Sequence, residues 1–173
     1  ATGDTIICAG GSAQLSVTGG GPKSWSVLPG GSPITSLSCT QCDNPIATPT
    51  VSTYYVAEGC DFDTVFVEVV QVPIPTVTPR TTTCVNANLQ LNVTPADATL
   101  FNYSWSSNTP NNFLNSTTIH NPVVQNPDPA GTNSIIYTVM VTPKNLAGGP
   151  MAACATSSTV IVDILKGFSI DPY

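Results

Sequence analysis

One stretch of this sequence occurs twice, and the repetition limits the fold more than any other feature. The stretch from Ser38 to Val56 runs through a turn-rich corner into an alternating strand, and a second version runs from Ser116 to Val139. Asn121-Pro122 in the second version corresponds to Asn44-Pro45 in the first. A chain that repeats itself in this way is expected to contain two copies of one structural unit.

Short alternating segments separated by Gly and Pro turns predict strands throughout both copies. In the longest predicted strand of the first copy, Val65, Val67 and Val69 share one face. The chain contains 16 Pro and 13 Gly at short spacing, and no segment shows helical periodicity. A Trp lies within a predicted strand of each copy, Trp25 and Trp105. These features predict an all-β protein of two tandem immunoglobulin-like antiparallel β-sandwiches.

The matched segments set the predicted domain boundaries. Residues 1–72 form the first immunoglobulin-like repeat and residues 80–165 the second, while residues 166–173 begin a following linker or repeat. Residues 73–79 carry Pro at alternate positions, which predicts an extended, semi-rigid linker between the repeats.

The charge content excludes several classes of partner. Only 8% of residues are charged, against about 25% in an average soluble protein. The net charge is −6 with four Lys and Arg, so no basic patch is expected for nucleic acid or anionic membranes. No apolar run reaches the roughly 18–20 residues of a membrane span. The even number of cysteines, six, favours an oxidising compartment and hence an extracellular location.

The six cysteines fall into a matched set and an unmatched pair. Four of them correspond between the copies, whereas Cys39 and Cys42 have Ser116 and Ile119 in their places. Residues that are present or absent together are best explained as bonded to each other. The predicted disulfides are therefore Cys8–Cys60, Cys84–Cys154 and Cys39–Cys42.

The Cys39-Thr-Gln-Cys42 motif has two other interpretations, a redox pair and a zinc site. A redox pair needs a helix N-terminus that lowers the thiol pKa, and the strand that follows Asn44-Pro45 supplies none. Zinc needs four ligands, and the single histidine, His120, lies in the other repeat. A structural disulfide is therefore preferred.

No catalytic site is predicted. A Ser–His–Asp triad would have to use His120, which aligns with the turn residue Asp43, and the sequence has no G-x-S-x-G elbow. The scattered acidic residues give no reason to choose a pair for glycoside hydrolysis. Asp61 and Asp63, together with Asp43, are candidate oxygen ligands for calcium in the first repeat only. No other cofactor is expected.

The aromatic residues suggest either a sugar-binding platform or a hydrophobic core. Trp25 and Trp105 alternate with core-facing positions, and Tyr54, aligned with Tyr137, lies in a predicted strand. Core packing is the preferred interpretation.

Taken in order, the motifs of the first repeat resemble a known family. Cys8-Ala-Gly-Gly-Ser is followed by a Trp-Ser pair, then by Cys39-Thr-Gln-Cys42-Asp-Asn-Pro, Thr53-Tyr-Tyr-Val and Gly59-Cys60. This order resembles the Ig-like or PKD-like repeats of very large Bacteroidetes surface proteins, such as the SprB-type gliding-motility adhesins exported by type IX secretion. The second repeat matches more loosely and lacks the cysteine corner.

The resemblance implies an adhesin or stalk that contacts neighbouring repeats of its own chain and the gliding and secretion machinery. It also implies O-glycosylation at the Asp-Thr-apolar motifs of Thr5 and Thr64. The predicted function is a non-catalytic segment of a secreted, cell-surface adhesin that acts as a stalk or binds an extracellular ligand such as a surface polysaccharide. The alternative is an accessory carbohydrate-binding or spacer module of a secreted polysaccharide hydrolase.

Overall fold

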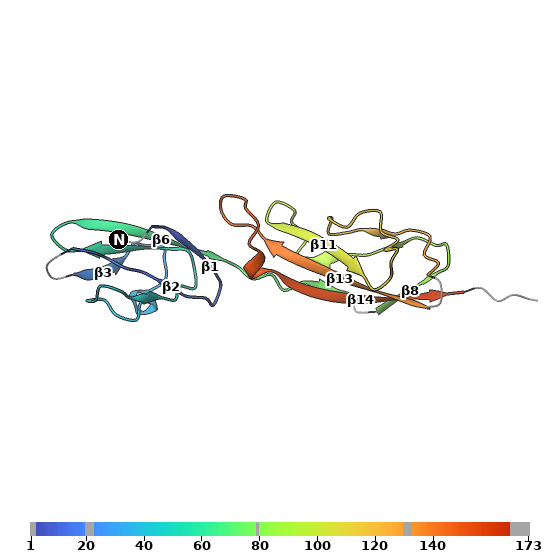
Figure 1. The fold of residues 1–173 in the computed structure, drawn as a ribbon, viewed down its shortest axis with the longest axis horizontal. Helices are drawn as coiled ribbons and strands as arrows, with labels where there is room; N and C mark the ends of the chain where they lie inside the picture. The colour runs from blue at the N-terminus through green and yellow to red at the C-terminus, as the bar shows by residue number, and fades with distance from the viewer. Residues whose placement is uncertain (1–2, 20–22, 79, 130–132, 167–173) are drawn as a thin grey trace, which may run out of the picture. The chain divides into compact units, whose positions relative to one another are not determined.

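The chain forms two compact β-sandwich units, shown in Figure 1 as a computed structural model. The structure describes residues 3–19, 23–78, 80–129 and 133–166. The first unit comprises Ala1–Val72 together with Asn145–Cys154, and the second comprises Pro73–Lys144 and Ala155–Tyr173. Within the described ranges, no helix has the length and apolar character needed to cross a membrane.

The first unit contains a four-stranded sheet in the order β1-β6-β5-β3 and a two-stranded sheet of β2 and β4. Its elements are β1 (Thr5–Cys8), β2 (Ala13–Gln14), β3 (Ser24–Val27), the 3-10 turn η1 (Ile34–Ser36), β4 (Ile46–Ala47), β5 (Thr53–Glu58) and β6 (Phe62–Val70). Buried side chains between the sheets include Leu15, Trp25, Tyr55, Val65 and Val67. The alternation along β6 places Val65 and Val67 in this core, as predicted.

The pairing of β1 departs from the expected antiparallel arrangement. β3, β5 and β6 pair antiparallel, but β1 runs parallel to β6, with Thr5 opposite Val67 and Cys8 opposite Val70. The end of β1 therefore lies at the end of β6, and not at its beginning.

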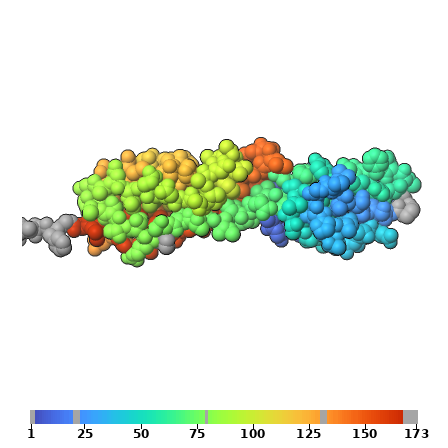
Figure 2. Space-filling view, turned by 180° about the vertical axis from the view of Figure 1, so that it is seen from behind, coloured from blue at the N-terminus to red at the C-terminus, as the bar shows by residue number. Residues whose placement is uncertain are grey.

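The second unit repeats this design with longer strands. Its elements are β7 (Thr76–Val77), β8 (Arg80–Cys84), β9 (Leu89–Gln90), β10 (Val93–Thr94), β11 (Phe101–Ser107), β12 (Val123–Val124), β13 (Ser134–Pro143) and β14 (Thr156–Leu165). The main sheet has the order β11-β13-β14-β8, and β8 runs parallel to β14. The chain between β11 and β13, yellow to light orange in Figure 2, forms part of the surface of this unit.

The prediction of a separate linker is wrong for residues 73–78, and residue 79 lies outside the described residues. β7 pairs antiparallel with β10, and Thr156 donates a hydrogen bond from its hydroxyl to the carbonyl of Pro73. Pro73 and Pro75 are buried. Pro73 and Pro75 keep the segment extended. The backbone of Thr76 and Val77 pairs with β10, so the segment joins the second unit.

The predicted second repeat, residues 80–165, also loses a segment to the first unit. Asn145–Cys154, which follows β13 and contains the 3-10 turn η2 (Ala152–Cys154), belongs to the first unit. The backbone N–H of Leu146 donates to the carboxylate of Glu68, a β6 side chain that is only 8% exposed. The predicted element at 166–173 lies, apart from residue 166, outside the described residues.

Candidate functional site

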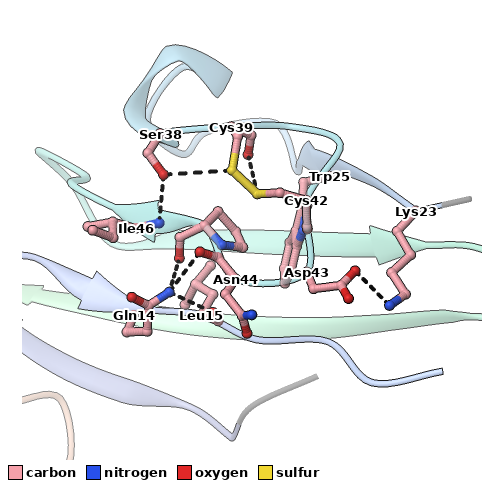
Figure 3. Close-up of a disulfide and its surroundings, with 11 residues drawn as sticks. Gln14, Leu15, Lys23, Trp25, Ser38, Cys39, Cys42, Asp43, Asn44 and Ile46 are labelled. Carbon is pink, nitrogen blue, oxygen red and sulfur yellow. Dashed lines mark hydrogen bonds and ion pairs between the residues drawn. A yellow bond between two sulfur atoms is a disulfide. The ribbon is translucent and has the colours of Figure 1, made fainter.

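The cysteine corner of the first repeat is built around a buried tryptophan (Figure 3). The backbone N–H of Trp25 donates to the carbonyl of Thr40, and its indole N–H donates to the carbonyl of Cys42, both at 2.8 Å. Trp25 is 4% exposed, so its indole N–H requires a protein acceptor. The Cys42 carbonyl is that acceptor, and this hydrogen bond holds the corner against the sandwich.

A glutamine on β2 fixes the other side of the same corner. The amide of Gln14 donates to the carbonyls of Asn44 and Pro45, at 2.9 and 3.0 Å, as Figure 3 shows. The backbone N–H of Leu15 also donates to the carbonyl of Pro45, at 2.9 Å. The Asn-Pro pair of the sequence motif therefore supplies two carbonyl acceptors to one glutamine side chain.

Cys39 and Cys42 are joined by a disulfide across this corner, which is the short pair predicted from the sequence. Both residues are partly buried. Next to them, Lys23 and Asp43 form an ion pair at 2.6 Å. A bonded pair presents no thiolate to a metal or a substrate, so this corner has the chemistry of a structural brace.

The second repeat keeps the corner without the disulfide. The Trp105 indole donates to the carbonyl of Ile119 at 2.8 Å, and Gln90 donates to the carbonyls of Asn121 and Pro122. His120 occupies the position of Asp43, because its carbonyl accepts from Val93 as that of Asp43 accepts from Val17. The hydrogen bonds of the corner therefore persist without the disulfide.

The alignment of Tyr54 with Tyr137 is wrong by one residue. Trp25 lies opposite Ala57 and Trp105 opposite Val139, so the counterpart of Tyr137 is Tyr55. Both tyrosines are 0% exposed, and burial raises the pKa of each phenol above its ordinary value. Tyr54 is 47% exposed because a shift of one residue along a strand moves a side chain to the opposite face.

The predicted pairs Cys8–Cys60 and Cys84–Cys154 are also wrong. The structure joins Cys8 to Cys154, with 5.4 Å between their Cα atoms and a sequence separation of 146. Cys154 is buried, whereas Cys60 and Cys84 are free and exposed.

The parallel pairing of β1 explains this error. Cys8 lies opposite Val70 at the end of β6, whereas Cys60 precedes the first residue of β6. A nine-residue strand spans roughly 25 Å, while a disulfide requires Cα atoms within about 7 Å. Likewise, Cys84 lies opposite Leu165 at the end of β14, whereas Cys154 precedes the first residue of that strand. Antiparallel pairing would have brought each predicted pair close together.

The acidic residues considered for calcium do not converge. The carboxylates of Asp61 and Asp63 each accept a hydrogen bond from the next backbone N–H, at 2.8 Å, and Asp43 is paired with Lys23. Across the described parts of the chain, no three His, Cys, Asp or Glu side chains are grouped so that they could hold a metal ion.

The two threonines considered for O-glycosylation differ in accessibility. Thr64, on β6, is exposed, whereas Thr5 is partly buried in the parallel pair with β6. His120, considered for a triad, lies with its ring centroid 5.9 Å from that of Tyr103. Sequence reasoning did not predict that Cys60 and Cys84 are free thiols. Their state depends on the direction in which β1 and β8 run, which the sequence pattern does not reveal.

Solved structures with a similar fold are tandem immunoglobulin domains. A titin structure of three immunoglobulin domains, an E-to-A variant, matches with a TM-score of 0.50 and 14% identity, covering 95% of this chain and 63% of that chain. An I-band fragment of titin gives 0.49 and 15%, covering 94% and 62%. The three N-terminal domains of the outer capsid protein Hoc of bacteriophage RB49 give 0.47 and 17%, covering 92% and 56%.

This chain therefore spans less than two thirds of each of these structures. At such low identity the likeness concerns the fold, which is that of two tandem immunoglobulin-like β-sandwiches. No protein-family model matches the sequence, and neither does any curated protein.

Proposed function

We propose that this chain is a non-catalytic segment of a secreted, cell-surface adhesin, in which it acts as a load-bearing stalk or binding module. The observation that carries the proposal is the Cys8–Cys154 disulfide, which closes a loop of 146 residues. This covalent bond encloses almost all of the strands of both repeats.

The bond determines where tension travels when the chain is pulled at its ends. Tension enters at the N-terminus, reaches Cys8, crosses the disulfide to Cys154 and leaves through β14. The strands from β2 to β13 lie between the two cysteines and are shielded from the load. Such shielding suits a protein that must stay folded while it is stretched between a cell and a surface.

Outside the bond, the parallel strand pairs resist the same load. β1 pairs with β6 over four residues, and β14 pairs with β8 over five. Tension applied along a strand loads all its ladder hydrogen bonds at once, so these pairs oppose extension more strongly than a hairpin opened from its end.

Three further features support an extracellular adhesin. Disulfides form and persist in oxidising compartments, and two are present here. The motifs of the first repeat resemble those of gliding-motility adhesins, which are exported by type IX secretion. Thr64 is exposed within an Asp-Thr-Val motif, so its hydroxyl is accessible for the O-glycosylation that the resemblance implies.

Living cells of the source organism provide the test. Beads that carry antibody against this chain would be added to the cells and tracked, with beads carrying non-immune antibody as the control. Specific beads that bind and travel along the cell support a motile adhesin, and beads that bind and remain in place support a passive stalk. Antigen found only in the medium would contradict a surface adhesin.

A second candidate, an accessory carbohydrate-binding module, has one favourable observation. Tyr54 and Phe66 form an aromatic pair on the outer face of the main sheet, with ring centroids 4.4 Å apart. The same register in the second repeat holds Ile136 opposite Ile161, an aliphatic pair, which indicates cross-strand packing as the role of this position. Glycan-array binding that is lost in Tyr54→Ala would favour this second candidate.

A further inference from the structure

The two free cysteines occupy positions whose counterparts in the other repeat are bonded. Cys8 and Cys84 each end the strand that runs parallel to the last strand of its repeat. The next residue in each case donates a backbone hydrogen bond to that last strand, Ala9 to Val70 at 2.8 Å and Val85 to Leu165 at 3.0 Å. Cys8 is bonded, and Cys84 is free and exposed.

Cys60 and Cys154 form the second pair of equivalent positions. Cys60 lies in the turn between β5 and β6, and Cys154 lies in the longer connection between β13 and β14. Those strands are the corresponding antiparallel hairpins of the two repeats. Cys154 is bonded and buried, whereas Cys60 is free and exposed at the tip of its hairpin.

The one long-range disulfide therefore follows a rule. It joins the strand-end cysteine of the first repeat to the hairpin cysteine of the second repeat. Applied to the two free cysteines, the same pattern would pair Cys84 with a hairpin cysteine of a further repeat and Cys60 with a strand-end cysteine of another.

The surroundings of Cys84 differ from those of Cys8 in exposure. Val70, opposite Cys8, is 5% exposed, whereas Leu165, opposite Cys84, is 56% exposed. Asp163 holds the position of Glu68 in the second repeat, and its carboxylate is paired with Arg80 at 2.6 Å. The second repeat thus carries an acidic side chain and a cysteine at the matching positions, and the residue opposite the cysteine is exposed instead of buried.

We infer that Cys60 and Cys84 are the two halves of an inter-repeat disulfide, in which Cys84 of one copy bonds to Cys60 of the next. The partner is another copy of this repeat, represented experimentally by a second molecule of this chain. Formation of the bond converts two thiols into one disulfide while a small-molecule disulfide such as oxidised glutathione is reduced to two thiols. Thiol–disulfide exchange supplies this route through a mixed disulfide. The inference rests on the equivalence of the cysteine positions and holds whether or not the adhesin proposal is correct.

Two single variants test the pairing. Cys60→Ser retains only the Cys84 thiol, and Cys84→Ser retains only the Cys60 thiol. Each variant alone, and the two mixed, would be incubated with a glutathione redox buffer and analysed by electrophoresis without reducing agent. We expect the wild-type chain to form a ladder, the mixture to stop at a heterodimer, and each variant alone to remain monomeric.

Trypsin identifies the bonded residues, because cleavage after Lys23, Arg80, Lys144 and Lys166 places Cys60 and Cys84 in different fragments. The heterodimer should yield residues 24–80 linked to residues 81–144. A control variant, Cys60→Ser/Cys84→Ser/Ser104→Cys, carries an exposed thiol on β11 and should give no preferred heterodimer with Cys84→Ser.

Three results would overturn the inference. Homodimers of either variant that form as readily as the heterodimer would show random collision of exposed thiols. A wild-type monomer with residues 24–80 linked to residues 81–144 would show that the two cysteines pair within one chain. Wild-type chains that stay monomeric with both thiols free in the redox buffer would show that the repeats do not bring these positions together.

Discussion

Removal of the Cys8–Cys154 bond should change how far the chain extends under force. The bond joins residues with a sequence separation of 146, so the chain between them cannot be extended. That length corresponds to about 500 Å of extended chain at roughly 3.4 Å per residue. With the bond intact, only residues 1–8 and 154–173 can lengthen, which amounts to about 90 Å. Among the described strands, only β1 and β14 lie outside the bond.

Optical tweezers with handles at the two chain ends measure this difference directly. The reference protein carries Cys60→Ser and Cys84→Ser, which removes the free thiols and prevents disulfide exchange. The test protein carries Cys8→Ser and Cys154→Ser in addition. We expect the test protein to show two unfolding events, one for each sandwich, and a total lengthening that exceeds that of the reference by about 500 Å.

The outcome distinguishes the observed pairing from the local one. Because the reference lacks Cys60 and Cys84, local pairing would leave it with no long-range bond at all. It would then lengthen as much as the test protein does. Equal lengthening of the two proteins would therefore refute both the Cys8–Cys154 bond and the shielding of the sandwiches from load.

Three further predictions concern covalent structure and stability. Tryptic digestion of the denatured, non-reduced chain should yield residues 1–23 linked to residues 145–166, and linkage of 1–23 to 24–80 would contradict the structure. Tyr137→Phe removes a hydroxyl that donates to the Asn112 carbonyl at 2.7 Å, so urea unfolding should show a loss of about 1–2 kcal/mol, whereas Tyr54→Phe on the exposed face should show almost none. Burial raises the pKa of Tyr55 and Tyr137 above 10.0. Their contribution to stability is therefore complete below pH 10.0 and declines as the pH rises toward the folded-state pKa. A melting temperature that stays constant above pH 10 would contradict this.

The sequence was informative wherever side-chain periodicity alone decides the structure. Alternation placed Val65 and Val67 in the core, and a mid-strand position placed Trp25 and Trp105 there. The Asn-Pro motif located the corner in both repeats. In each repeat the carbonyls of the corner accept hydrogen bonds from the same two donors, the Trp indole and the Gln amide. Each of these contacts therefore occurs at equivalent positions of the two repeats.

The register of the tyrosine strand was beyond this reasoning. Tyr54 and Tyr55 are adjacent, and both fit an alternating pattern with the residues around them. Pairing of β5 with β3, set by Trp25 opposite Ala57, selects Tyr55 for the core.

The sequence by itself determined the all-β class, the two repeats and core residues such as Val65, Val67 and the two tryptophans, because these depend on local alternation and turn chemistry. Only the tertiary structure decided the long-range partner of Cys8 and the placement of residues 73–78 and 145–154. Both outcomes depend on which strands become neighbours and in which direction they run. The parallel pairing of β1 with β6 moved Cys8 to the far end of the sheet from Cys60 and left two thiols free.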